Sequence, residues 1–522
     1  MPNVFKYNPS STEAKSLRKG NFYIGTGDVG KGPSSETGFY NGVTVGTFSY
    51  VMVLHRGDNV PTFYQIQDDE ELILRTNQID KSTVRTTKEE CFSYFAGQSD
   101  KQRLIGSGQS WSSYWKTLIS ATVENAAPND IVLTFTHGRP SLVSTDFAIG
   151  IYGNSIASAS WAGSILTLTL TLPVVVYNGS FLVTFNKTGQ TKAVANNVND
   201  GNTVAWYKHN DPVAGVVINT APGVNHWLDK FNYALGAEMI NQTQWYTPAY
   251  WNVFAANWSQ VGTTLVSNGS SGNLRKDAFL TVGLTYEYKI TVVRNAGTLA
   301  ILDGATLFFS ITASGTYTGC LTATAAFFLY SSTNFDGAIT LVSLKRISGN
   351  HLIQQTTANK PTWSAANGVL FDGVNDFMKT VAFAFVQPEF IYFVGRQITW
   401  TNSDYFIDGG SADRGLIYQS PAANNLRAYA GSFSGAISPP ANTFIIIRLL
   451  FNGANSSFRY NKEIAVAWDC GVRNMDGFTL GASAPGTSPG NIEVKEIILR
   501  RSADNADTQS AIYNYLENIN GL

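Results

Sequence analysis

The sequence predicts an all-β protein built from several β-sandwiches in series. Three observations favour this fold class. Apolar and polar residues alternate with a period of two in many short segments, and turn signals rich in Gly and Asp separate those segments. Charged residues make up only 14% of the chain, against roughly 25% in an average soluble domain. A chain of 522 residues is too long for one hydrophobic core, so we expect several domains.

The N-terminal region, residues 1–110, is Gly-rich and contains few long strand patterns. Its beginning has no periodicity, which predicts a docking arm or a disordered tail. The stretch TTKEECFSYFAG (86–97) predicts a short helix, because Thr87 can cap it and Glu90 lies three residues further on, as in a capping box. We expect residues 1–110 to form an irregular attachment region.

Residues 111–205 predict a small β-sandwich of immunoglobulin type. Leu166, Leu168, Leu170 and Leu172 alternate with Thr, and Pro173 ends the run. In an earlier strand we expect Leu133 and Phe135 to face the same side. The segment resembles the bacterial Ig-like family called SwmB in three stretches, SATVENAAPNDIVLTFTHG, ASWAGSILTLTL and FLVTFNKTGQTKAVANNVN. Domains of that family are usually spacers.

A connector is expected over residues 206–235, because Pro212, Pro222 and several Gly interrupt any pattern. A second β unit follows over residues 236–347. In its strand TYEYKITVV we expect one face to carry Tyr286, Tyr288, Ile290 and Val292. The order of WSQVG, TVGLTYEY and FDGAITLVSLK resembles the jelly-roll carbohydrate-binding modules of phage fibres and glycoside hydrolases.

Residues 348–522 predict a third β unit that ends in a helix. The helical pattern places Ile512, Leu516 and Ile519 on one face, with Gly521 as a C-terminal cap. The stretches VLFDGVNDFMKT, GFTLGAS and IEVKEIILRR resemble the concanavalin-like (laminin-G-like) sandwiches.

The stretch GVLFDGVNDFMKT (368–380) predicts a hairpin that begins this last sandwich, because Asp-Gly suits a tight turn. Phe371 and Phe377 would then face the core. A sugar-binding loop and a Ca²⁺ loop are the alternatives, although Ca²⁺ takes six to eight oxygen ligands and this stretch supplies few.

Exposed aromatic rings next to polar side chains are the candidates for carbohydrate binding, because such rings stack on the apolar faces of sugars. The second unit opens with a dense aromatic cluster, and the last unit has two loop-like groups. The candidate residues are Trp245, Tyr246, Tyr250, Trp251, Trp400, Asp404, Tyr405, Trp468 and Asp469.

The sequence offers no catalytic motif that stands out. It contains no HExxH, and no acidic pair is distinguishable from turn and surface positions. We therefore expect no enzyme activity, no cofactor and no metal. Cys91, Cys320 and Cys470 lie far apart, which predicts isolated buried thiols rather than disulfides.

These resemblances together imply a virion fibre protein, on the head or the tail, that adheres to host-surface glycans. The stretch from GNFYIGTGDVGKG to LILRTNQI looks like the openings of fibre proteins in crAss-like phages of gut Bacteroidetes. Such fibres are commonly trimers, and residues 1–110 would contact other capsid or tail proteins. The expected location is the virion surface, reached without a signal peptide, since the N-terminus has no apolar core segment.

The charge and hydropathy of the chain argue against two kinds of partner, and three rival functions remain. A net charge of −1 gives no electrostatic case for nucleic acid, and no stretch is apolar enough to predict membrane insertion. A tail-associated polysaccharide depolymerase, a purely structural capsid decoration and a bacterial surface glycan-binding protein remain the rival functions.

Overall fold

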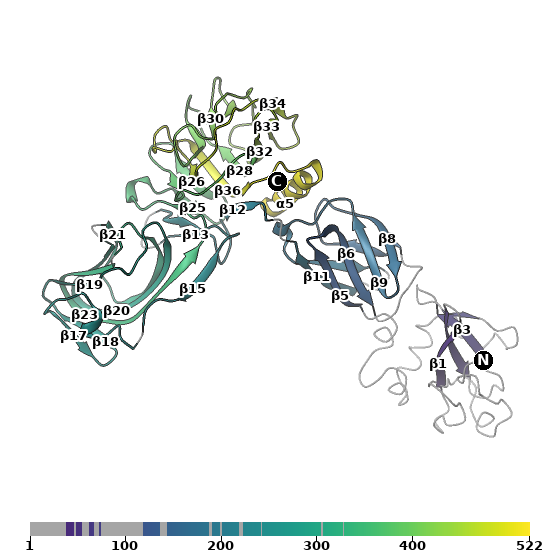
Figure 1. The fold of residues 1–522 in the computed structure, drawn as a ribbon, viewed down its shortest axis with the longest axis horizontal. Helices are drawn as coiled ribbons and strands as arrows, with labels where there is room; N and C mark the ends of the chain where they lie inside the picture. Colours follow the sequence, from purple (N-terminus) through teal and green to yellow (C-terminus); the bar gives the residue numbers. More distant parts are fainter. Residues whose placement is uncertain are drawn as a thin grey trace. The chain divides into compact units, whose positions relative to one another are not determined.

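The computed structural model describes residues 38–45, 48–54, 62–66, 72–74, 118–135, 143–186, 190–198, 201–218, 223–241, 243–303, 306–326 and 328–522. Within these ranges the regular elements are β-strands and single turns of 3₁₀-helix, together with one α-helix, α5 (Ala506–Asn520). The all-β fold class is therefore confirmed (Figure 1). The helix expected over 86–97 and the thiol of Cys91 lie outside the described residues.

The chain divides into two compact units, Met1–Asp200 with Asp507–Tyr515, and Gly201–Ala506 with Leu516–Leu522. The first unit begins with a four-stranded antiparallel sheet in chain order. Its strands are β1 (Gly38–Val45), β2 (Phe48–Leu54), β3 (Thr62–Ile66) and β4 (Leu72–Leu74).

The Ig-like segment of the first unit is a seven-stranded arrangement in the order β7-β10-β11-β5-β6-β9-β8. Leu166 and Leu168 are buried and lie opposite Leu133 and Ile131, so the predicted alternation is confirmed up to Leu170, where the strand ends. The strands are β5 (Leu118–Glu124), β6 (Ala127–Phe135), β7 (Phe147–Ile149), β8 (Ile156–Ala162), β9 (Ile165–Leu170), β10 (Phe181–Phe185) and β11 (Gln190–Asn197).

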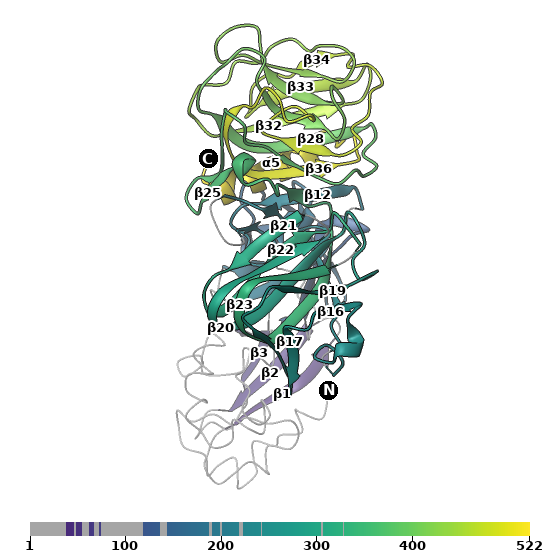
Figure 2. The same ribbon diagram turned by 90° about the vertical axis from the view of Figure 1, so that its left-hand side faces the viewer.

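The jelly-roll-like segment of the second unit is organised by two long strands that pair along most of their length, β20 (Thr285–Asp303) and β23 (Phe328–Ser348) (Figure 2). Tyr286, Tyr288 and Ile290 are buried on one face of β20, as predicted. The other strands are β15 (Ala234–Glu238), β16 (Val253–Phe254), β17 (Trp258–Val261), β18 (Thr264–Asn268), β19 (Gly272–Lys276), β21 (Thr306–Ile311) and β22 (Gly315–Thr322).

Two sheets of eight strands make the final sandwich, and an apolar core that includes Phe371, Phe393, Ile447 and Leu480 is buried within it. The first sheet contains β25 (Thr362–Ser364), β26 (Gly368–Asp372), β36 (Asn491–Arg500), β28 (Glu389–Gln397), β32 (Ile445–Phe451), β33 (Ser456–Tyr460), β34 (Val466–Trp468) and β12 (Thr203–Lys208). The second contains β13 (Val216–Val217), β14 (His226–Trp227), β24 (Leu352–Ile353), β27 (Met378–Lys379), β35 (Phe478–Leu480), β29 (Tyr405–Gly409), β30 (Leu416–Gln419) and β31 (Leu426–Tyr429).

Much of the segment expected as a connector belongs to this final sandwich. β12 pairs with β36 in the first sheet, while β13 and β14 begin the second sheet. The indole of Trp206 donates to Glu496 Oε1 over 2.7 Å, and Trp227 is buried in the core. The Pro and Gly residues between these short strands predict a linker, because strands of two residues leave no periodicity to detect.

The stretch GVLFDGVNDFMKT is not a hairpin. β26 pairs with β25 and β36 in the first sheet, whereas β27 pairs with β24 and β35 in the second. The turn therefore carries the chain from one sheet to the other. Asp372 Oδ1 accepts the backbone N–H groups of Val374 and Asn375, and Asp376 Oδ2 accepts that of Asp372. Phe371 is buried as predicted, but Phe377 is only half-buried and Met378 occupies the core instead.

We expect Gly373→Ala to destabilise the final sandwich by about 2–3 kcal/mol. Gly373 has φ +74°, and a Cβ placed there would lie 2.8 Å from Asn491 Cβ. The matched control is Gly453→Ala, which shares the left-handed backbone at φ +51° but would meet nothing within 4 Å, so it should cost about 1 kcal/mol. Calorimetry of both full-length variants checks the difference, and equal shifts in Tm would contradict it.

The C-terminal helix α5 follows the predicted pattern except at its end. Ile512 and Leu516 are buried, and Gly521 has φ +66° just after the last turn. Ile519, on the same predicted face, is 44% exposed, because it lies in the last turn. In the described ranges no helix has the length and apolar character needed to cross a membrane. Within the described part of the chain, Cys320 and Cys470 are buried thiols outside any disulfide, as predicted.

Candidate functional site

The aromatic cluster at the start of the jelly-roll-like segment is core rather than a sugar platform. Trp245, Tyr246 and Trp251 are buried. The rings of Trp245 and Trp251 meet edge to face with centroids 4.4 Å apart, and both contact the buried ring of Tyr330. The Trp251 indole N–H donates to the backbone oxygen of Trp245. Their expected exposure is wrong, because β23 supplies Tyr330 as a packing partner that local sequence does not reveal.

Tyr250 is the one residue of that predicted cluster that remains half-exposed. The Lys276 ammonium lies 4.4 Å from its ring centroid and also donates to the backbone oxygen of Tyr250. Because the cation covers the ring, this face of Tyr250 is not open for stacking.

A row of aromatic side chains lies on the outer side of β29, β30 and β31 in the final sandwich. We call Tyr405, Tyr418, Tyr429 and Phe433 the aromatic row. Tyr405 lies opposite Tyr418 in the register of β29 and β30, with ring centroids 6.1 Å apart. Phe433 bridges the others, since its centroid is 5.7 Å from Tyr418 and 4.6 Å from Tyr429. Phe433 is 53% exposed.

The local sequence explains why these rings face outward. β30 (LIYQ) and β31 (LRAY) alternate, so Ile417, Leu426 and Ala428 enter the core while Tyr418 and Tyr429, on the opposite face, point away from it. After β31 the chain turns back on itself, and an isolated bridge between Tyr429 and Phe433 brings the Phe433 ring over the sheet. The row is thus held by strands rather than by a free loop.

The other predicted residues of the final sandwich border this row, and Trp468 lies at the end of β34 rather than in a loop. Trp400 donates its indole N–H to the backbone oxygen of Asn425, in the turn between β30 and β31. Trp468 donates to the backbone oxygen of Ser432, next to Phe433. Tyr405 is itself part of the row, and Asp404 precedes it with a pKa raised by burial. Asp469 caps its own turn by accepting the Gly471 N–H.

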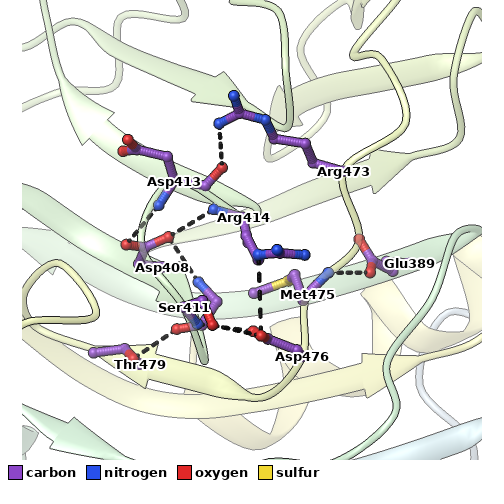
Figure 3. Close-up of polar contacts among 10 residues, drawn as sticks. Glu389, Asp408, Ser411, Asp413, Arg414, Arg473, Met475, Asp476 and Thr479 are labelled. Atoms are coloured by element: carbon purple, nitrogen blue, oxygen red, sulfur yellow. Dashed lines mark hydrogen bonds and ion pairs between the residues drawn. The ribbon is translucent and has the colours of Figure 1, made fainter.

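A cluster of polar side chains lies at the end of β29, where the turn to β30 meets the loop before β35 (Figure 3). Asp408 is buried and accepts backbone N–H groups from Gly409, Asp413, Arg414 and Ala484. Burial nevertheless raises the pKa of Asp408, because desolvation outweighs those hydrogen bonds. The Asp408 carboxylate therefore shapes the turn that presents the neighbouring side chains.

The loop before β35 is held to this turn by Asp476. Its carboxylate accepts the N–H and the hydroxyl of Ser411 and lies 4.0 Å from the Arg414 guanidinium. Burial alone would raise the pKa of Asp476, but the Ser411 hydrogen bonds and the Arg414 charge together lower it. Arg473, in the same loop, donates to the backbone oxygen of Asp413 over 3.2 Å.

Beneath this loop lies Glu389, a buried acid that the sequence analysis did not single out. Its Oε1 accepts the backbone N–H of Met475 over 2.6 Å, while Oε2 has no partner. Burial raises the pKa of Glu389 to about 9, and the Met475 hydrogen bond only partly opposes that rise. Glu389 is thus a neutral acid that anchors the loop rather than a group that reaches a ligand.

Tyr405 is among the residues predicted from sequence, whereas Tyr418, Tyr429 and Phe433 are not. The signal for two of them was present, because GLIYQS and NLRAYAGS alternate and place a Tyr on the polar side of each strand. Phe433 follows Gly431 in a turn, and nothing local predicts that its ring returns to the sheet.

No protein-family model matches the chain, and no curated protein matches it. Among solved structures, Trypanosoma rangeli sialidase in complex with sialic acid matches with 9% identity over 91% of this chain and 92% of that one, at a TM-score of 0.22. A mutant of the same sialidase that displays trans-sialidase activity matches with 10% identity over 97% and 98%, at a TM-score of 0.23.

The expectation that this chain is not an enzyme is contradicted by these matches to sialidases, and we withdraw it. Identities of 9–10% with TM-scores of 0.22–0.24 carry no argument about activity, substrate or family, so we infer nothing more from these matches.

Proposed function

We propose that this chain is a virion fibre protein whose final sandwich adheres to glycans on the host surface. The observation that carries the proposal is the aromatic row, with Phe433 more than half exposed and in contact with two tyrosine rings. Exposed aromatic rings of this kind provide a flat apolar surface, and the ring hydrogens of a sugar can stack on it while nearby polar groups bond its hydroxyls.

The surroundings of the aromatic row supply such polar groups. The carboxylate of Asp413 lies 3.5 Å from the Tyr405 hydroxyl, and the exposed residues Asp469 and Ser432 are next to Trp468. The strands of β29, β30 and β31 hold the rings before any ligand arrives, so little entropy is lost in ordering them on binding.

The placement in a virion is supported by sequence alone. A Gly-rich N-terminal region that looks like the openings of crAss-like phage fibres precedes a series of β-domains, and charged residues make up only 14% of the chain. In this proposal residues 1–110 attach to capsid or tail proteins and three chains assemble. Each site would bind in the millimolar range, worth about −4 kcal/mol, and three linked copies would strengthen attachment by avidity.

We expect Phe433→Ala to weaken attachment of the full-length protein to gut Bacteroidetes cells by about tenfold, because loss of a stacking ring costs about 1.4 kcal/mol. Tyr152→Ala is the matched control, since Tyr152 is 50% exposed but lies in the Ig-like segment. Flow cytometry of labelled protein on a panel of strains measures the effect. If neither the parent nor Phe433→Ala binds any strain, the chain is a purely structural decoration.

A further inference from the structure

Two arginines flank the rings at one end of the aromatic row. The Arg427 guanidinium carbon lies 5.8 Å from the Phe433 centroid, and that of Arg473 lies 5.3 Å from the Tyr429 centroid. The two rings are themselves 4.6 Å apart. Each guanidinium is within cation–π range of its ring, so both positive charges border the same small area of exposed aromatic surface.

The structure holds these guanidiniums in place without neutralising them. Arg427 Nε donates to the backbone oxygen of Ser434 over 2.9 Å, and Arg473 Nη1 donates to that of Asp413. Among the residues that the structure describes, no carboxylate lies within ion-pair distance of either group. Arg396 and Arg500, in the same sandwich, are by contrast paired with Glu493 and Asp504.

The nearby acids are already engaged. Asp408 is saturated by backbone N–H groups, and Asp476 is bound by Ser411 and faces Arg414. The Asp413 carboxylate faces the Tyr405 hydroxyl, whereas only its backbone oxygen meets Arg473. A guanidinium has five N–H donors in a planar fork that matches a carboxylate, and one donor of each arginine makes the bond described above.

We propose that the aromatic row selects sugars that carry a carboxylate, with Arg427 and Arg473 binding the carboxylate while Phe433, which is 53% exposed, stacks on the sugar ring. This inference rests on the proposed function, since it names the ligand class of the same surface. A neutral sugar would leave both guanidiniums without an anionic partner, and an acidic sugar gains charge-assisted hydrogen bonds there.

Affinity gel electrophoresis of the full-length protein tests this ligand class. The gels contain polygalacturonate, polymannuronate or hyaluronan, each beside its methyl ester, and dextran sulfate serves as a polyanion without carboxylates. We expect at least one acid form to bind about tenfold more tightly than its ester. Arg427→Gln and Arg473→Gln should each weaken that binding about tenfold, whereas Arg501→Gln, at an exposed position of the same sandwich, should leave it unchanged.

The outcomes separate this inference from the proposed function. Equal binding of acid and ester that Phe433→Ala abolishes would overturn the carboxylate preference and leave glycan adhesion intact. Binding to dextran sulfate that all three arginine variants weaken alike would overturn it as non-specific charge attraction. Binding to none of these polymers also overturns it, and both ideas fall if Phe433→Ala binds cells as well as the parent does.

Discussion

Replacing Asp504 by Ala is expected to destabilise the final sandwich by about 3–5 kcal/mol, because it leaves a buried guanidinium without its counter-charge. Arg500, on β36, donates to Asp504 through Nε at 2.7 Å and Nη2 at 2.9 Å. Both side chains are almost fully buried, at 3% and 2% exposure. The Tyr392 hydroxyl, on β28, donates to the same carboxylate over 2.8 Å.

The Arg500–Asp504 pair joins three neighbouring strands of the first sheet at the end of β36. Arg500 Nη1 also donates to Thr203 Oγ1 on β12, and β12 and β28 both pair with β36. Loss of the carboxylate would therefore disturb the seam that ties the expected connector to the sandwich. The unpaired charge would account for most of the loss of stability. Truncation of Asp504 also removes the hydrogen-bond partner of the buried Tyr392 hydroxyl.

Calorimetry of the full-length protein can measure this cost as a fall in Tm of at least about 6 °C. Asp507→Ala is the control, because Asp507 is an exposed acid in the first turn of α5 and should contribute about 1 kcal/mol or less. A fall in Tm no larger than that of the control would contradict the assignment.

Periodicity predicted the parts of this fold in which one face of a strand is buried. The alternation in ILTLTL and in TYEYKITVV gave the inward residues of β9 and β20 correctly. It failed for the connector, because β13 and β14 have two residues each. It also failed for the turn after Asp372, since local turn chemistry is the same whether the next strand joins the same sheet or the opposite one.

The candidate site was harder to predict than the fold, because exposure of an aromatic ring depends on partners distant in sequence. Trp245 and Trp251 look like a platform locally, yet Tyr330 buries them. Phe433 has no distinctive context, yet the bridge to Tyr429 makes it the most exposed ring of the aromatic row. Arg473 joins that row through a loop more than forty residues further on, which no local pattern encodes.

Glu389→Gln is expected to remove a large loss of stability at alkaline pH. The carboxyl is buried, and its pKa in the folded protein is about 9, raised from an ordinary value of 4.5. Between those values the folded protein retains a proton that the unfolded chain releases. The contribution of Glu389 is therefore fully present below about pH 4.5 and is lost as the pH rises towards 9, on the order of 5 kcal/mol in total.

The Gln variant keeps an oxygen for the Met475 N–H but cannot ionise, so its stability should change less between pH 5 and pH 9 than that of the parent. Urea unfolding at several pH values measures the difference, and Glu463→Gln, at an exposed position, is the control. Parallel pH profiles for parent and Gln variant would contradict the assignment.

Ionisation of Glu389 is also expected to affect ligand binding at the aromatic row. Met475 lies two residues after Arg473, and burial opposes ionisation of Glu389 more strongly than the Met475 hydrogen bond favours it. Ionisation is therefore expected to draw water beneath this loop and to loosen its hold on the guanidinium over Tyr429. Binding should then weaken above about pH 8 in the parent and persist in Glu389→Gln, which links a buried acid to the presentation of one surface charge.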